Sequence, residues 1–251
     1  MLRRMLPCSI GRQRILTGLL RGQWIVTSWH DYPAAILGRT ERPLLDWFAQ
    51  NVRNGDTWLD IGAHYGYTAI ALSRLVGPNG RVFAFEPMMS TAGHLAKTRL
   101  VNGLSQLMVL PLALAEPETF GLAYMPTVRG MVDSTLQEHE WTEAILVARF
   151  DWLWPQICQG QRQVHGVKID VQGMEIEVLH GMKDTLRAFR PKLVVEVHQG
   201  VDRGELLDLI EGAGYVRQAV PIEPVEGETD PLYLDDRSYA FLPIQPPFDL
   251  S

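Results

Sequence analysis

Thr57-Trp-Leu-Asp-Ile-Gly-Ala-His-Tyr-Gly66 is the stretch of sequence that decides the fold. Its first five residues are mostly apolar and predict a short buried strand, and the glycines that follow predict a tight turn. A helix is expected next, over residues 67–76, and the turn Gly77-Pro-Asn-Gly80 ends it. A glycine turn between a buried strand and a helix is typical of ligand-binding α/β sheets.

The alternation of strand and helix continues along most of the chain. After the glycine turn we expect a strand over residues 81–86, a helix over 91–101 and a strand over 106–115. It resumes with a strand over 164–170, a helical stretch over 174–188, a strand over 192–198 and a helix over 203–213. This order predicts a doubly wound, Rossmann-like α/β fold with a mostly parallel sheet, to which residues 215–220 and 239–242 add an antiparallel edge.

Two segments depart from this alternation. We expect residues 1–50 to form an N-terminal extension, a helical lid or arm, ahead of one domain over residues 51–251. From Thr40 onward the extension predicts a helix, whose apolar residues recur at helical spacing: Leu44, Leu45, Phe48 and Val52. Residues 116–150 form an insertion, in which 120–125 and 144–150 are expected to be strands or irregular structure. We expect the insertion to cover the acceptor side of a ligand crevice, with Asp133-Ser-Thr135 at the mouth.

Composition and charge narrow the class of protein. The chain has 251 residues, 46% hydrophobic and 21% charged, which are ordinary globular values. Its net charge of −6 argues against a general nucleic-acid partner, RNA included. Cys8 and Cys158 have no paired metal-ligand spacing, so a cysteine zinc site is not expected. No apolar run reaches the length of a membrane span and no convincing signal peptide is present, so a cytoplasmic location is expected.

Arginines are concentrated at the N-terminus, at positions 3, 4, 12, 14 and 21, with no acidic residue among the first thirty. A solvated surface is the favoured interpretation of this cluster. Contact with a membrane or an acidic carrier is the less favoured alternative.

The glycine turn and the end of the next strand predict where a ligand binds. In an open α/β sheet, ligands bind beyond the carboxyl ends of the strands. Asp60 precedes the glycines, where its carboxylate repels a pyrophosphate but suits the amino group of a methionine moiety. Glu86 ends the second strand and is placed to accept hydrogen bonds from ribose hydroxyls, with Pro87 beside the adenine. A tight turn with a helix cap, and no ligand, is the structural alternative for the loop alone.

Several motifs, taken together, resemble the FkbM family of methyltransferases over about residues 55–200. They are Asp60-Ile-Gly-Ala63, Arg81-Val-Phe-Ala-Phe-Glu-Pro87, Val167-Lys-Ile-Asp-Val-Gln-Gly-Met-Glu175, Arg190-Pro191 and Glu196-Val-His198. The resemblance implies S-adenosylmethionine as the methyl donor and usually O-methylation of a hydroxyl on a small molecule, a sugar or a secondary metabolite. The donor-binding residues expected on this basis are Asp60, Gly62, Ala63, His64, Gly66, Glu86, Pro87 and Asp170.

This chain departs from the family pattern at four positions. His64, Gln172, Met89 and Thr98 stand where the family usually has Asn, Glu, Pro and Asn. The donor site can tolerate these changes, but they weaken any transfer of an acceptor from the family. His64 is expected either to cap the following helix or to touch the carboxylate of the donor.

The catalytic residues are expected at the ends of the two strands near residues 170 and 198. Asp170 can orient the donor or the acceptor, and Lys168 lies on the same face of the strand. His198 is the expected base for the acceptor hydroxyl, with Glu196 as a neighbour. A structural Lys168–Asp170 pair and a purely hydrogen-bonding His198 are the structural alternatives. A divalent-metal site made by Asp170, Glu196 and His198 is a less favoured alternative, and we expect no bound metal.

Two other functions share parts of these features. A nicotinamide dehydrogenase has the same fold and a ribose-binding acid, but its loop usually reads Gly-x-Gly-x-x-Gly without the preceding Asp. A non-catalytic module that only binds the donor is the other alternative, since His64 and Gln172 depart from the family.

Overall fold

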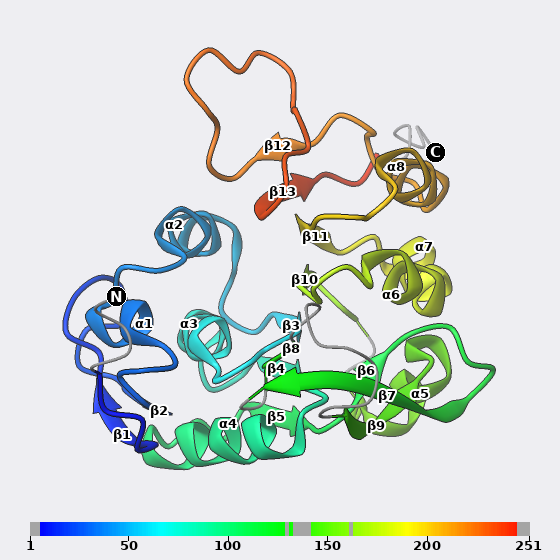
Figure 1. The fold of residues 1–251 in the computed structure, drawn as a ribbon. Coiled ribbons are helices and arrows are strands. Elements are labelled where there is room, and N and C mark those ends of the chain that lie inside the picture. Colours follow the sequence, from blue (N-terminus) through cyan, green and yellow to red (C-terminus); the bar gives the residue numbers. More distant parts are fainter. Residues whose placement is uncertain (1–5, 129–130, 133–141, 161–162, 245–251) are drawn as a thin grey trace. The chain divides into compact units, whose positions relative to one another are not determined.

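The computed structural model describes residues 6–128, 131–132, 142–160 and 163–244, and its elements are labelled in Figure 1. The chain divides into two compact units. Unit 1 contains residues 1–113 and 121–147, and unit 2 contains residues 114–120 and 148–251.

Unit 1 is built on parallel strands that the apolar runs predict. Strands β3 (Thr57–Ile61), β4 (Arg81–Phe85) and β5 (Leu107–Leu110) pair in parallel in this order. Every residue of β3 is buried, which is why the run is nearly continuous in apolar side chains instead of alternating. The expected strand over residues 106–115 is interrupted at Pro111, whose nitrogen has no hydrogen to donate. A second short strand, β6 (Ala113–Leu114), follows it.

Helices of unit 1 pack beside this sheet. Helices α3 (Tyr67–Val76) and α4 (Met89–Val101) follow β3 and β4, as the sequence predicts. Helix α2 (Arg42–Asn51) packs against α3 and buries Leu44, Leu45 and Phe48, which confirms the predicted apolar face. A short helix, α1 (Pro33–Leu37), precedes it.

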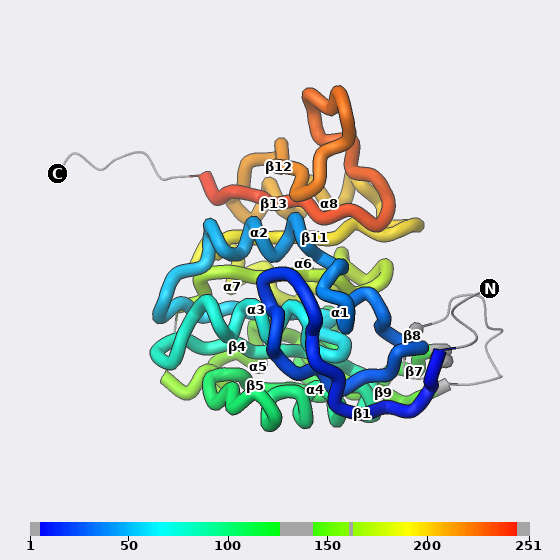
Figure 2. Tube along the Cα trace, turned by 90° about the vertical axis from the view of Figure 1, so that its left-hand side faces the viewer, coloured from blue at the N-terminus to red at the C-terminus, as the bar shows by residue number. Residues whose placement is uncertain are grey.

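The beginning of the chain differs from the expected helical extension. Residues 11–27 form a hairpin in which β1 (Gly11–Arg14) pairs antiparallel with β2 (Trp24–Thr27). Exposure alternates with a period of two along β1: Arg12 and Arg14 are exposed, and Gly11 and Gln13 are half-buried. Side chains of α4 then bind the backbone of β2, so the hairpin lies along that helix (Figures 1 and 2). Among the described residues of the extension, from residue 6 onward, the helical ones belong to α1 and α2.

Of the two alternatives for the segments near the ends of the insertion, strands are the one that the structure shows. These are β7 (Phe120–Val128) and β9 (Thr142–Ala148), with β8 (Met131–Val132) pairing antiparallel with β7. The Asp133-Ser-Thr135 stretch lies outside the described residues, and the proposed position of the insertion over a crevice stays a prediction. A helix that was not predicted, α5 (Phe150–Ile157), follows β9.

Unit 2 contains the other parallel pair and the antiparallel edge. Strand β10 (Gly166–Ile169) pairs in parallel with β11 (Lys192–Val197). Strand β13 (Arg237–Phe241) is antiparallel to β11, and β12 (Val220–Pro221) is antiparallel to β13. The antiparallel edge predicted from the C-terminal segment is therefore confirmed, although residues 215–219 contribute only an isolated bridge from Tyr215.

Helices of unit 2 lie between and after its strands. The helical stretch predicted over residues 174–188 is divided into α6 (Glu175–Gly181) and α7 (Lys183–Phe189). At the division the chain passes very close to the backbone of Ala115, because a Cβ on Gly181 would lie 2.0 Å from that carbonyl oxygen. Helix α8 (Arg203–Gly212) follows β11, and the side chain of Asp202 caps it by accepting from the N–H of Glu205 at 3.0 Å. Among the described residues, no helix is long and apolar enough to cross a bilayer.

Candidate active site

The glycine loop of unit 1 has the backbone that the sequence predicts. Gly62 and Gly66 have φ of 81° and 92°, and His64 between them has φ of 48°, so three positions of the loop are left-handed. Glycine adopts this region without the steric cost that a Cβ imposes. The N–H groups of Gly62 and Ala63 donate to the carbonyl of Phe85 at 3.0 and 2.9 Å, which fastens the loop to the end of β4.

Gly66 is required for a second reason. It is the N-cap of α3, and a Cβ at this position would lie 2.2 Å from Cδ1 of Leu95, on α4. As a glycine, the N-cap residue has no side chain with which to cap α3, and both roles considered for His64 stay predictions. The loop can therefore pack closely on α4 because residue 66 is a glycine and has no Cβ.

Asp60 is fully buried at the carboxyl end of β3. Its Oδ2 accepts a hydrogen bond from the hydroxyl of Thr68, in the first turn of α3, at 2.7 Å. A buried carboxylate in this place is held in one orientation beside the first turn of the helix.

Glu86 follows β4 and is 6% exposed. Its Oε2 accepts from the N–H of His64 at 2.9 Å, and its Oε1 accepts from the N–H of Met88 at 3.0 Å. The carboxylate thus joins the glycine loop to the start of α4, and each oxygen keeps capacity to accept a further hydrogen bond. The structure brings Asp60, Gly62, Ala63, His64, Gly66, Glu86 and Pro87 together at the loop and adjoining strand ends of unit 1.

An aromatic group beside the loop escaped the sequence reasoning. The ring of Tyr32 lies 5.2 Å from that of His64 and 6.3 Å from those of Tyr65 and Tyr67. Tyr65 and Tyr67 are buried next to the glycines and could have been singled out by their position. Nothing local in the sequence marks Tyr32, because only the packing of residues 28–37 brings it to the loop.

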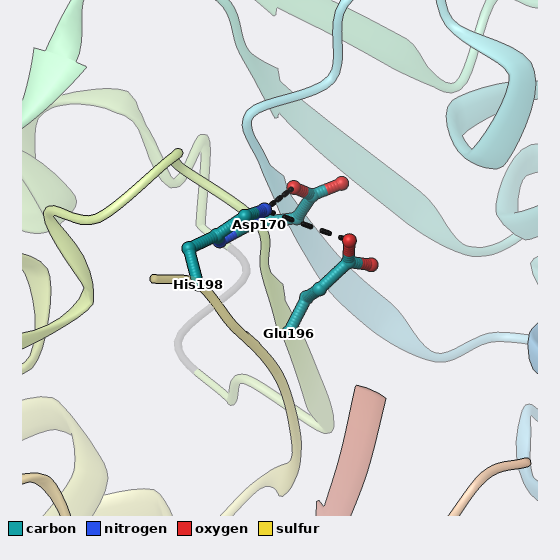
Figure 3. Close-up of side chains that lie close together, drawn as sticks. All are labelled: Asp170, Glu196 and His198. Carbon is teal, nitrogen blue, oxygen red and sulfur yellow. Dashed lines mark ion pairs between the residues drawn. The ribbon is translucent and has the colours of Figure 1, made fainter. Parts of the chain in front are cut away.

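The second group of predicted residues gathers in unit 2, and Figure 3 shows it. Asp170 follows β10, Glu196 lies on β11 and His198 follows β11. Because β10 and β11 are parallel neighbours, their carboxyl ends meet at one edge. Nε2 of His198 is 3.5 Å from Oδ1 of Asp170 and 3.5 Å from Oε1 of Glu196.

The imidazole of His198 is held from both sides. Nδ1 lies 2.6 Å from Oε1 of Glu175, the first residue of α6, which is fully buried. Nε2 lies 2.8 Å from the amide nitrogen of Gln172. In the neutral form of the ring, an amide nitrogen that donates to Nε2 leaves the hydrogen on Nδ1, which then donates to Glu175. Gln172 is exposed, so an incoming hydroxyl can displace its amide.

The surroundings of His198 change its acidity. Burial lowers the pKa of the ring, but the hydrogen bond to Glu175 and the charges of Asp170, Glu175 and Glu196 act in the opposite direction and prevail. The pKa of His198 is therefore raised above its ordinary value. Such a ring is a stronger base than a free histidine, and it is neutral only at a correspondingly higher pH.

Neighbouring groups hold the two carboxylates. Nζ of Lys168, which is 3% exposed, lies 3.0 Å from Oδ2 of Asp170, so the predicted same-face pair is present. Oε2 of Glu196 accepts from the hydroxyl of Ser238, on β13, at 3.2 Å. Each carboxylate is held through one oxygen, and the other oxygen points to His198.

The same cluster has the donors of a cation site. One ligand atom from each of Asp170, Glu196 and His198 lies within 4.8 Å of the others. Two carboxylates and an imidazole are a donor set that divalent metals accept, so geometry alone allows proton transfer or metal binding here.

Glu175 is the functional candidate that the sequence reasoning missed. It lies in the quoted motif, but a glutamate opening a predicted helix is ordinarily explained by the helix dipole. Glu175 differs from an ordinary helix-opening glutamate in being fully buried. The sequence of this helix is about half apolar, so it does not predict that burial.

Comparisons with known proteins agree with the motifs. Residues 60–217 match the family model of the methyltransferase FkbM domain. The hexuronic acid methyltransferase AglP of Haloferax volcanii is 26% identical to this chain over 177 residues, which cover 70% of each protein.

Solved structures are similar at the level of the fold. The methyltransferase FkbM from Methylobacillus flagellatus KT has a TM-score of 0.50 at 17% identity, with 78% of this chain and 50% of that one covered. An rRNA methylase from Streptococcus thermophilus has a TM-score of 0.51 at 11% identity, with 83% of this chain and 99% of that one covered.

Proposed function

Because the chain belongs to the family of methyltransferases with the FkbM domain, we propose that it transfers the methyl group of S-adenosylmethionine to a hydroxyl oxygen of a small sugar-like molecule. Methyl transfer and its donor follow from the family. The hydroxyl acceptor and the roles of individual residues are the proposal, and they rest on the two clusters of buried polar side chains at strand ends.

The donor is assigned to the glycine loop and to the strand ends beside it. Asp60 supplies a negative charge for the amino group of the methionine part, and Glu86 supplies oxygens for the two ribose hydroxyls. The left-handed glycines at 62 and 66 let the backbone approach the donor closely, with Ala63, His64 and Pro87 lining the same loop. Asp60 and Glu86 fit S-adenosylmethionine because both are acidic. A carboxylate suits the cationic sulfonium and the amino group, and it can also accept hydrogen bonds from the two hydroxyls of the ribose.

The acceptor is assigned to the cluster of unit 2. When bound, the donor supplies an activated methyl carbon, so the residues have to position the nucleophile and remove its proton. His198 is proposed as the general base that takes the hydroxyl proton on Nε2. Asp170 and Glu196 orient the hydroxyl and stabilise the imidazolium that forms.

One observation carries the assignment of the base. His198 is bound at Nδ1 by a fully buried carboxylate, and the described groups near Nε2 are the Gln172 amide and two carboxylates, which an acceptor hydroxyl can displace or join. This arrangement selects the tautomer with its lone pair toward the carboxylates. A histidine that served only packing would not need its tautomer defined from both sides.

A sugar-like acceptor is supported by one relative. AglP is named for methylation of a hexuronic acid, and it shares 26% identity over most of this chain. Hexuronic acids carry several hydroxyls and one carboxylate. We therefore propose an acceptor of the sugar or sugar-acid class. The family rules out the dehydrogenase considered from the fold alone, and leaves the non-catalytic module for experiment.

The test uses methyl-labelled S-adenosylmethionine with glucuronic acid, galacturonic acid, their glycosides and the matching neutral hexoses. Methyl ethers in the product, identified by mass spectrometry, would support the proposal. His198→Ala should lower turnover by roughly 10²–10⁴ and leave donor affinity nearly unchanged.

Two results would contradict parts of this proposal. Tight donor binding without transfer to any hydroxyl compound would favour the non-catalytic module. Near-normal turnover of His198→Ala with an unchanged acidic limb in the pH–rate profile would remove His198 as the base.

A further inference from the structure

One face of the β1–β2 hairpin is exposed to solvent, and along β1 exposed and less exposed side chains alternate. From residue 10 to residue 16 every second side chain is exposed: Ile10, Arg12, Arg14 and Leu16. Ile10 is 41% exposed and Leu16 is 47% exposed, which are large fractions for aliphatic side chains. Period-two exposure places these four side chains on the same side of the strand.

The second strand and the connecting loop extend this face. Trp24 lies directly opposite Arg14 in the register, and its ring is within 5.4 Å of the guanidinium of Arg14 and 5.8 Å of that of Arg12. In the loop, Leu19 is 47% exposed and Arg21 is exposed as well. We call this set the hairpin face: Ile10, Arg12, Arg14, Leu16, Leu19, Arg21 and Trp24.

The charge of the hairpin face contrasts with the rest of the chain. The first thirty residues contain five arginines and no acid, whereas the whole chain has a net charge of −6. The first acidic residue, Asp31, is 3% exposed and binds the hydroxyl of Ser28 at 2.6 Å. Arginines in this segment therefore have no acidic sequence neighbour on the surface, and an anionic partner is the complementary one.

The hairpin is anchored through the backbone of β2. The N–H of Trp24 donates to Asn102 Oδ1 at 2.9 Å, and the amide of Asn102 donates to the carbonyl of Trp24 at 2.7 Å. The N–H of Val26 donates to the hydroxyl of Thr98 at 2.9 Å. Ile15 and Ile25 are buried beneath the hairpin. Helix α4 thus holds the hairpin, and Figure 2 shows the hairpin in dark blue toward the viewer.

We propose that the hairpin face is a docking surface for an anionic lipid membrane. Guanidinium groups bind lipid phosphates through paired hydrogen bonds, and aliphatic side chains at the ends of the face can enter the boundary of the acyl region. Tryptophan prefers this interfacial depth, because its ring is apolar with one polar N–H. The combination of basic, aliphatic and indole groups on one side of a hairpin matches these layers.

The hairpin face lies close in sequence to a residue that contacts the glycine loop. Tyr32 follows β2 by five residues, and its ring lies 5.2 Å from that of His64. A hairpin held at a membrane would keep the glycine loop of the same unit close to that membrane. The inference concerns where the protein binds and does not rest on the identity of the methyl acceptor.

Co-sedimentation of the full chain with vesicles tests the proposal. One set of vesicles contains phosphatidylglycerol and phosphatidylcholine, and the other contains phosphatidylcholine alone. We expect binding to the first set, and weaker binding when salt shortens the range of the charge interaction. Arg12→Gln with Arg14→Gln should weaken binding by about 25-fold, since each arginine near an anionic surface strengthens it by roughly fivefold.

Aliphatic variants and a matched control complete the design. Leu16→Ser with Leu19→Ser should reduce binding and leave its salt dependence in place, because the charges remain. Leu232→Ser with Leu234→Ser is the control, because these leucines are 56% and 39% exposed but lie in the acidic C-terminal segment. Unchanged thermal unfolding and binding of S-adenosylhomocysteine would show that each variant is folded.

Three outcomes would overturn the proposal. They are equal binding to both sets of vesicles, wild-type binding by the arginine variant, and binding to a soluble polyanion such as heparin without binding to the charged vesicles.

Discussion

Substitution of Gly66 by alanine tests the packing of the donor loop. Gly66 has φ of 92°, and an added Cβ would lie 2.2 Å from Cδ1 of Leu95, far inside van der Waals contact. Two costs arise. The left-handed backbone costs a residue with a Cβ about 1–2 kcal/mol, and overpacking of a buried leucine costs about 1–3 kcal/mol. We expect Gly66→Ala to lower the free energy of unfolding by about 2–5 kcal/mol in total.

Urea denaturation measures this loss, and the chain offers a matched control. Gly93 lies within α4, and a Cβ there would meet no atom within 4 Å. Gly93→Ala should therefore stabilise the protein by about 0.5–1 kcal/mol, because alanine loses less conformational freedom in a helix. Equal unfolding slopes for both variants are required before their midpoints are compared.

A double-mutant cycle separates the two costs. Leu95→Ala removes the atom that the new Cβ would strike, and alone it should cost about 2–5 kcal/mol through the cavity it leaves. In the double variant the overpacking disappears and the backbone cost remains, so the loss should be smaller than the sum by about 1–3 kcal/mol. Additive losses, or a Gly66→Ala protein as stable as the wild type, would refute the reasoning.

Three further predictions concern the two clusters. Glu86→Ala should weaken binding of S-adenosylhomocysteine by about 1–3 kcal/mol in calorimetry, and unchanged affinity in a folded variant would remove Glu86 from the donor site. The folded-state pKa of His198 is raised. Its pair with Glu175 should therefore add stability below pH 6.5, the ordinary pKa, and lose it as pH rises through the raised value. Denaturation at a series of pH values should show this loss in the wild type and much less of it in Glu175→Gln. Asp170→Asn should lower turnover, and a chelator should not; activity lost to the chelator and restored by Mn²⁺ would make Asp170 a metal ligand.

Local patterns were enough for the central elements of the fold. The strand over residues 57–61 and the helix over 67–76 have the predicted bounds, because a buried strand, a glycine turn and an apolar helix are each specified by neighbouring residues. The lysine on the face of Asp170 was also predictable, since side chains alternate along a strand. The N-terminal hairpin was not, because it is held on α4 by Thr98 and Asn102, more than seventy residues away in the chain.

The sequence by itself determined which residues reach the ends of the strands, and therefore named Asp60, Glu86, Asp170 and His198. Only the tertiary structure decided what those side chains meet. Glu175 binds the ring of His198 across 23 positions of sequence, and Glu86 binds the backbone of His64 across 22. Such contacts form between elements that pack side by side, so no periodicity within one element can reveal them. Their geometry sets the tautomer and the pKa of His198, because both depend on which charges and donors the folded chain places around the ring.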